Sequence, residues 1–399
     1  MEDIESAWSK FCDEDINDEL NELSAPSITE MTTIKGMIPK CSPLNISTKT
    51  KIAYLNIPID LRRVFWQIPV VTYHEPMIGV VKKQMKFNST TPEEVAEIMQ
   101  NKSEYNYVDD YVISQIHNPD GRVKFKDIRK ISIGICKKDI TSYRCKRKSA
   151  FYNCFVVILR LLHFDMYKEI HVKLFNTGKL EIPGIQDSTI LDKVLTLLVN
   201  ILMPIVLKNT ENDAAAALAK ANTPDANNDA SVVNMPLQFL DNKSETVMIN
   251  SNFSCGYYIN REKFYKLLKY KYKINSNFDP CSYPGIQCEF YYDDLILHKD
   301  QHGIQPSQER TGTTQVTKVS FMIFRTGSVL IVGKCSEEML YQIYTFLCHI
   351  FEAEYDEIKW VGGTEICNKN KEKGRKIRKK IIMIGGSAPS PPTQATPHL

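Results

Sequence analysis

The sequence predicts an α+β protein built from two copies of one unit of strands and helices. Two stretches of similar sequence, residues 172–185 and 321–334, each read as a strand, a Thr-Gly turn and a second strand. An apolar pattern with helical spacing follows each stretch. A segment poor in large apolar side chains, residues 209–243, separates the two copies. A repeat of this kind indicates a duplicated fold.

The two predicted hairpins align without gaps. Residues 172–185 read VKLFNTGKLEIPGI and residues 321–334 read FMIFRTGSVLIVGK. Side chains alternate between the two faces of a strand, and in the second hairpin both faces are apolar. One helix covers only one face, so the other face needs a further layer of this protein or a partner. Periodicity alone favours the first of these, a fully buried strand. The identical positions are Phe175 with Phe324, Thr177 with Thr326, Gly178 with Gly327 and Gly184 with Gly333.

The elements around each hairpin repeat as well. Asp187 and Ser188 precede one apolar helical pattern and Ser336 precedes the other, and these residue types favour a helix N-cap. Each half also opens with a strand and a helix and has an aromatic-bearing strand before its hairpin. These predicted elements are residues 46–56, 59–68 and 151–160 in the first half and 249–259, 260–272 and 278–292 in the second.

Composition shifts divide the chain into five parts. We expect an acidic N-terminal extension at 1–45, a first repeat at 46–208 with an insertion at about 76–149, and a low-complexity linker at 209–243. A second repeat at 244–357 holds a shorter insertion at about 294–317. The remaining residues, 358–399, form a basic and then Pro/Ser-rich tail, expected to be disordered.

The charges and apolar runs favour a protein inside a cell with no membrane span. The 399 residues are 43% apolar and 24% charged, enough for a sizeable core. No secretory signal opens the chain, and Asn200 and Pro204 interrupt its longest apolar stretch. Nine acidic residues precede Ser24 against Lys10, and eight basic residues lie between Lys369 and Lys380. Both runs are read as solvated tails, although the basic one also fits phosphate attraction or nuclear targeting.

Nothing in the spacing of reactive residues predicts an enzyme, a metal site or a cofactor. The eleven cysteines form no CxxC pair and are interpreted as reduced thiols. His298 and His302 lie in a polar stretch and are interpreted as exposed side chains. The GxSxG, Walker and HExxH motifs do not occur. We therefore expect a non-enzymatic protein.

Several motifs resemble the TATA-box-binding protein family. In the second half these are INSNFSCGYYINREKF, FDPCSYPGI and the hairpin with its helix, and in the first half IDLRRV, YHEP and VKLFNTGKLEIPG. The resemblance covers residues 46–206 and 246–355 without the insertions. The divergent, Lys/Asn/Ile-rich sequence is similar to the versions found in nucleocytoplasmic large DNA viruses. The resemblance implies a duplicated saddle, a curved antiparallel sheet with helices on its convex face and a DNA minor groove on its concave face.

The resemblance also implies which residues would contact DNA. Aromatic wedges are expected at Phe175, Phe324, Tyr283 and Tyr152. Groove-reading polar side chains are expected at Asn250 and at Thr48, or at Ser47 if the alignment shifts by one residue. Apolar groove contacts are expected at Leu330 and Val332, and phosphate contacts at Arg160 and Lys179. Three positions depart from the family pattern. Glu181 and Pro183 replace an apolar residue and a threonine, and Glu289 replaces an arginine. A carboxylate at such a position repels phosphate.

Two hypotheses about function follow. The first is a viral TATA-binding-like initiation factor that binds A/T-rich double-stranded DNA and nucleates the viral RNA polymerase with a transcription factor IIB-like partner. Its expected location is a cytoplasmic viral factory, the nucleus or the virion. The second is a scaffold whose concave face holds a protein segment, for which the acidic residues 1–24 are one candidate.

Overall fold

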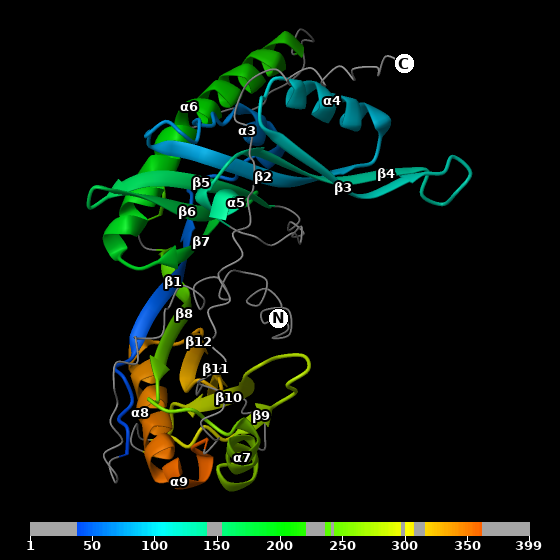
Figure 1. The fold of residues 1–399 in the computed structure, drawn as a ribbon. Helices are drawn as coiled ribbons and strands as arrows, with labels where there is room; N and C mark the ends of the chain where they lie inside the picture. Colours follow the sequence, from blue (N-terminus) through cyan, green and yellow to red (C-terminus); the bar gives the residue numbers. More distant parts are fainter. Residues whose placement is uncertain are drawn as a thin grey trace, which may run out of the picture.

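One antiparallel sheet of twelve strands, with helices packed mainly against one side, makes up the fold (Figure 1). The computed structural model describes residues 38–141, 154–220, 236–240, 243–296, 300–306 and 316–360. The predicted α+β class is confirmed, and the sheet is visibly curved in Figure 1. The strands run in the order β3-β4-β2-β5-β6-β7-β1-β8-β12-β11-β10-β9.

The strands fall into two groups that meet at the middle of the sheet. The first group is β1 (Asn45–Tyr54), β2 (Gly79–Ser89), β3 (Val108–His117), β4 (Phe125–Gly134), β5 (Cys154–His163), β6 (Met166–Phe175) and β7 (Lys179–Ile185). The second group is β8 (Glu245–Ser254), β9 (Asn275–Asn277), β10 (Ile286–Asp293), β11 (Val316–Ile323) and β12 (Ser328–Gly333).

The order of strands is mirrored about the β1–β8 pair. From β1 outward the neighbours are β7, β6 and β5, and from β8 outward they are β12, β11 and β10. In each half, therefore, the opening strand pairs with the last strand of the predicted hairpin. The saddle shape that the resemblance implies stays a prediction.

Each half has its own hydrophobic core on the helix side of the sheet. In the first half α3 (Leu61–Gln67), α4 (Pro92–Ser103) and α6 (Ser188–Lys220) contribute to one cluster. In the second half α7 (Arg261–Lys266), the π-helical turn η2 (Leu267–Lys271), α8 (Glu337–Ala353) and α9 (Tyr355–Ile358) contribute to another. We call the opposite side of the sheet the open face. The remaining described helix, α5 (Lys137–Thr141), contacts β2 on that open face.

The predicted helix starts are confirmed by their hydrogen bonds. The Ser336 hydroxyl accepts from the Met339 amide at 3.1 Å at the start of α8. Asp187 accepts from the Thr189 amide at 3.0 Å at the start of α6. Both side chains thus satisfy amides that have no partner inside the helix.

The region predicted as an insertion, residues 76–149, extends the sheet. It supplies β2, β3 and β4, which lie outside β5, and the helices α4 and α5. Ile98 of α4 is buried in the first core. By topology β2 matches β9, which lies outside β10, but β9 is only three residues long, and β3 and β4 have no counterpart among the described strands of the second half, so the repeat gave no signal for these strands.

The predicted linker is partly wrong. Helix α6 continues to Lys220, and Leu55 forms a β-bridge with Phe239. Residues 209–220 are rich in alanine, which has the highest helix propensity, so they extend helix α6 instead of forming a linker. Residues 221–235 lie outside the described part of the chain, as do residues 1–37 and 361–399 with the acidic and basic tails.

Helix α6 contains the one segment of the described residues that has the length and composition of a membrane span. Its segment Ser188–Asn212 has a mean hydropathy of 2.1 and is long and apolar enough, by length and composition alone, to cross a bilayer. In the fold, 39% of its most apolar window is buried, and Val194, Leu198 and Leu202 pack in the first core. Its apolar character is therefore used, at least in part, to cover the sheet.

Residues 38–44, assigned to the N-terminal extension, lie against the second half. The Ser42 amide donates to Ser254 O at 2.8 Å, and the Tyr344 hydroxyl of α8 donates to Ser42 O at 2.9 Å. Leu44 packs against the second core. The chain therefore contacts the second half before it enters the first.

Candidate nucleic-acid interface

The two hairpin turns have the same construction. The amides of Gly178 and Gly327 each donate to the carbonyl of the phenylalanine three residues earlier, at 3.0 Å in both cases. The two glycines have φ angles of 80° and 83°, in the left-handed region. A Cβ on Gly178 would lie 2.7 Å from Ile57 O, and one on Gly327 would collide with Tyr257 O. Glycine at these turns places Phe175 and Phe324 at equivalent corners of the sheet.

The rings of Phe175 and Phe324 are half-buried and lie on the open face, as predicted. The Lys179 ammonium lies 5.6 Å from the Phe175 ring centroid. The Tyr283 ring lies 6.0 Å from the Phe324 ring, and its hydroxyl contacts Met322 Sδ at 3.1 Å. The predicted pairing of Tyr283 with Phe324 is therefore present. Tyr152, its expected first-half equivalent, lies outside the described residues.

An apolar cluster forms the open face of the second half. Met322, Leu330 and Val332 are 0%, 3% and 8% exposed and pack with Tyr283 and Phe324. Leu330 and Val332 thus lie on the predicted face. Because they are covered in this conformation, contact with a ligand requires the surrounding side chains to move.

The equivalent positions of the first half carry charge. The gap-free alignment of the hairpins places Lys173, Glu181 and Pro183 at the positions of Met322, Leu330 and Val332. Lys173 Nζ lies 2.8 Å from Glu181 Oε1, and the two side chains are 11% and 28% exposed. The carboxylate expected to repel phosphate is therefore neutralised by a lysine on the next strand.

Polar side chains meet at the middle of the sheet, where β1 pairs with β8. Thr48 lies directly opposite Asn250, so the two predicted groove-reading residues are neighbours. Asn252 Nδ2 donates to Ser47 Oγ at 2.6 Å beside them. Asn252 was missed by sequence reasoning, although its place two residues after Asn250 on one strand puts it on the same face.

Arg160 lies on the open face but is bound within the protein. Its Nη1 donates to Tyr73 O at 3.0 Å and to Glu75 O at 2.9 Å. Its Nη2 lies 3.5 Å from Glu169 Oε1, and only 6% of the side chain is exposed. The phosphate contact expected of Arg160 stays a prediction, and it requires these bonds to be exchanged.

By register the second half has Tyr291 at the position of Arg160, because Tyr291 lies opposite Lys318 and Arg160 lies opposite Glu169. Glu289, which departs from the family pattern, accepts from Lys318 Nζ at 3.0 Å and from Asn275 Nδ2 at 2.7 Å. The hairpin alignment, extended by three residues, makes Lys318 the equivalent of Glu169. Both halves therefore carry an ion pair in this region, but Glu289 lies two residues before the equivalent of Arg160, which corrects the match expected from the sequence.

Helix α5 lies on the open face of the first half, on the far side of the sheet from α6 (Figure 1). Cys136, just before α5, packs against Val81 and Ile158, and Ile158 points away from the core because its neighbours Val157 and Leu159 point into it. Burial and three nearby lysines lower the pKa of His171 on this face to about 4, so its imidazole is neutral at pH 7. Sequence reasoning missed this arrangement because α5 has no counterpart among the residues of the second half that the structure describes.

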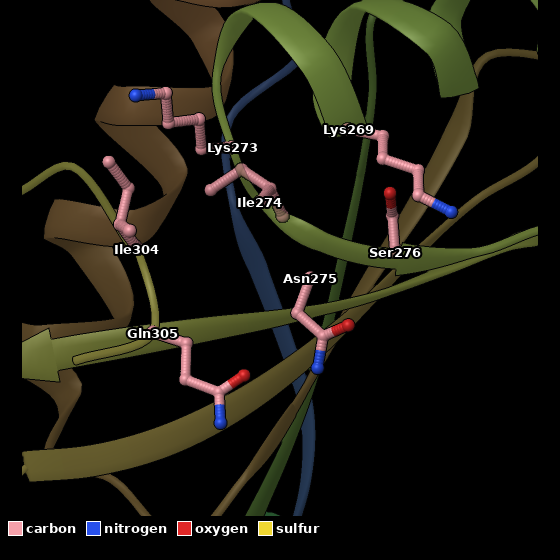
Figure 2. A pocket seen from close by; sticks show the side chains of 7 residues that line it. All are labelled: Lys269, Lys273, Ile274, Asn275, Ser276, Ile304 and Gln305. Atoms are coloured by element: carbon pink, nitrogen blue, oxygen red, sulfur yellow. The ribbon is translucent and has the colours of Figure 1, made fainter. Parts of the chain in front are cut away.

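A cavity of about 270 Å³ lies at the β9 edge of the sheet (Figure 2). Its lining contains neither an acid nor a histidine or cysteine, and so offers no acid–base pair for catalysis. Within the described residues, no group of three or more metal-ligating side chains comes together. The lining residues are Lys269, Lys273, Ile274, Asn275, Ser276, Ile304 and Gln305.

Comparison with known proteins supports the resemblance read from the motifs. A protein of Acanthamoeba polyphaga mimivirus named "TATA-box-binding protein-like" is 22% identical to this chain over 225 residues. The match covers 56% of this chain and 54% of the mimivirus protein, so the chain spans about half the length of that relative. Among solved structures, Methanococcus jannaschii TBP matches 78% of this chain and 99% of its own, with 12% identity and a TM-score of 0.33. No family model matches the chain.

Proposed function

We propose that this chain is a TATA-box-binding-protein-like initiation factor that binds A/T-rich DNA through the minor groove with the open face of its sheet. One observation carries the proposal. The half-buried rings of Phe175 and Phe324 occupy equivalent Thr-Gly turns on either side of a polar centre formed by Thr48 and Asn250. The name of the mimivirus relative supports the same function.

The chemistry of these residues suits the groove. A phenylalanine ring inserted between base pairs replaces part of the stacking that it breaks. An asparagine amide donates to the acceptors that A·T and T·A pairs share in the minor groove, so it favours A/T-rich sequence without fixing the strand. Asn250 and Asn252 supply such amides at the centre of the sheet.

The partners and the location are part of the same proposal. A factor of this kind recruits a transcription factor IIB-like protein and the viral RNA polymerase to the promoter. It acts in a viral factory or in the nucleus, or it is carried in the virion. The viral origin of the relative supports this assignment.

A second candidate function is a protein-interaction scaffold that does not bend DNA itself. It is favoured by the open face of the first half, where the Lys173–Glu181 ion pair replaces apolar groove contacts and α5 contacts the strands. A scaffold of this kind would bind a protein segment where the first function binds DNA.

One experiment separates the two candidates. Binding of the full chain to duplexes is measured by fluorescence anisotropy across a salt series, using A/T-rich, G/C-rich and inosine–cytosine duplexes. An I·C pair keeps the minor-groove acceptors of an A·T pair while its major groove resembles that of G·C. We expect A/T-rich and I·C duplexes to bind alike, G/C-rich duplexes to bind more weakly, and affinity to fall as salt rises. Affinity independent of salt and sequence would favour the scaffold.

A further inference from the structure

A short segment covers part of the open face of the first half. Residues 135–141, here called the α5 cap, contact three strands. Cys136 packs on Val81 of β2 and Ile158 of β5. The Lys137 amide donates to Glu169 Oε2 of β6 at 2.7 Å. The cap is thus held by apolar and polar contacts together.

An ion pair fastens the cap to β2. Lys82 Nζ donates to both carboxylate oxygens of Asp139, at 2.7 and 2.8 Å, and the lysine side chain is 14% exposed. Burial tends to raise the pKa of Asp139, but Lys82 and the hydrogen bonds from Cys136 outweigh it, so the pKa lies below its usual value. Asp139 is therefore ionised at neutral pH and neutralises Lys82.

A second cation beside the cap, Arg160, is neutralised in the same way. Arg160 is paired with Glu169, the residue that also accepts from the cap amide of Lys137. The guanidinium lies 4.6 Å from the Tyr73 ring centroid. Two basic side chains on the open face are thus each held by a carboxylate of the same chain.

We propose that the α5 cap, together with Glu169 of β6, mimics a DNA strand, with the carboxylates of Asp139 and Glu169 standing where two backbone phosphates bind Lys82 and Arg160 in the engaged state. This inference rests on the proposed function. Lysine and arginine form charge-assisted hydrogen bonds with carboxylate and phosphate oxygens alike, so phosphates replace the carboxylates without leaving a buried cation unpaired. The first half then contacts DNA only after the cap is released.

The second half has a different arrangement. Every helix described there, α7, η2, α8 and α9, contributes buried residues to the core on the other side of the sheet. Its open face is apolar at the positions where the first half is charged. The cap therefore has no counterpart among the described helices of the second half.

The test compares the full-length wild type with Asp139→Asn, which removes the carboxylate charge and keeps the side-chain shape. Binding to an A/T-rich duplex is measured as a function of salt. Because Lys82 becomes available for a phosphate, we expect roughly three- to tenfold tighter binding and a salt dependence steeper by about 0.9 in log K against log salt. The matched control is Asp192→Asn, an exposed carboxylate on α6. It loses the same charge and should leave the slope unchanged.

A double variant and a second readout complete the test. Lys82→Gln combined with Asp139→Asn should return the salt slope to that of the wild type. Hydrogen exchange at residues 135–141 should speed up in the wild type when DNA is added. If Asp139→Asn binds with wild-type affinity and slope, or exchange in the cap slows on DNA binding, the mimic is overturned while the proposed function stands. If no variant binds DNA in a salt-dependent manner, the proposed function fails and the mimic with it.

Discussion

In the second half of the sheet, Met322 and Leu330 lie opposite each other on β11 and β12 within an apolar cluster. The equivalent cross-strand pair of the first half, Lys173 and Glu181, is an ion pair at 2.8 Å. The core sides of the same strands are apolar in both halves. The two halves therefore share the interactions that specify the fold and differ on the face that is available for binding.

The flanking ion pairs show the same divergence in another form. Arg160 pairs with Glu169 in the first half, at 3.5 Å, and Glu289 pairs with Lys318 in the second, at 3.0 Å. Each pair keeps the local charge balanced, although Glu289 lies two residues before the equivalent of Arg160 on its strand. The two pairs differ in the ligand that they attract once they open, because a freed arginine binds phosphate and a freed glutamate repels it.

The largest expected effect contrasts the two hairpin rings. Phe324→Ala should weaken binding to an A/T-rich duplex by roughly 5- to 150-fold, the value of one stacked base. Phe175→Ala should cost less than about fivefold, because the capped first half contributes less of the binding free energy. Anisotropy titrations measure both.

The control for this pair is Tyr341→Ala, which removes an exposed ring from α8 on the other side of the sheet. Its affinity should equal that of the wild type. Equal losses of affinity for the two phenylalanine variants would mean that both halves contact DNA alike. The two halves would then differ in sequence but not in how they bind DNA.

The next effect concerns the ion pair itself. Glu181→Leu removes the carboxylate that Lys173 contacts and should lower the free energy of unfolding by roughly 1–3 kcal/mol, less than for a fully buried pair because Glu181 is 28% exposed. Adding Lys173→Met gives the residues of the second half, and stability should return to within about 1 kcal/mol of the wild type. Urea denaturation measures all three proteins. A double variant less stable than Glu181→Leu would show that the first half cannot accept the apolar arrangement.

How much of this comparison the sequence predicts depends on what each feature requires. The hairpins follow from Gly178 and Gly327, whose turns exclude a side chain, and the core faces follow from alternation. The strands β3 and β4 and the α5 cap were not predicted, because no repeat or motif marks them, and β2 was missed because its counterpart β9 is only three residues long. The burial of Arg160 was also beyond the sequence, since it depends on where the loop carbonyls of Tyr73 and Glu75 lie. A site built from cross-strand or loop contacts can be predicted only when the strand register and the path of the loop are known.

Another difference between the halves is a lysine buried in the first core. Lys83 is fully buried, donates to Ile68 O at 2.6 Å, and has a pKa that burial lowers to about 7. Between pH 7 and the usual lysine value near 10.5, the unfolded chain binds one proton more than the folded chain, so stability rises with pH. We expect a slope of roughly 1 kcal/mol per pH unit across this window.

Lys83→Met removes this titration while keeping an unbranched side chain. The urea midpoint of unfolding, measured from pH 7 to pH 10, should rise with pH more steeply in the wild type than in the variant. Parallel curves would show that Lys83 remains charged in the folded protein.

The smallest expected effect tests the apolar cluster of the second half. Tyr283→Phe removes the hydroxyl that contacts Met322 Sδ and keeps the ring beside Phe324. The stability should change by less than about 1 kcal/mol, because sulfur is a weak acceptor and the ring packing is retained. DNA affinity should stay the same or rise slightly, since a ring without a hydroxyl needs no polar partner when it enters a base stack. Denaturation and anisotropy on the same preparation measure both quantities. A large loss of affinity would instead make the hydroxyl a direct groove contact, and the second half would then bind through polar as well as apolar groups.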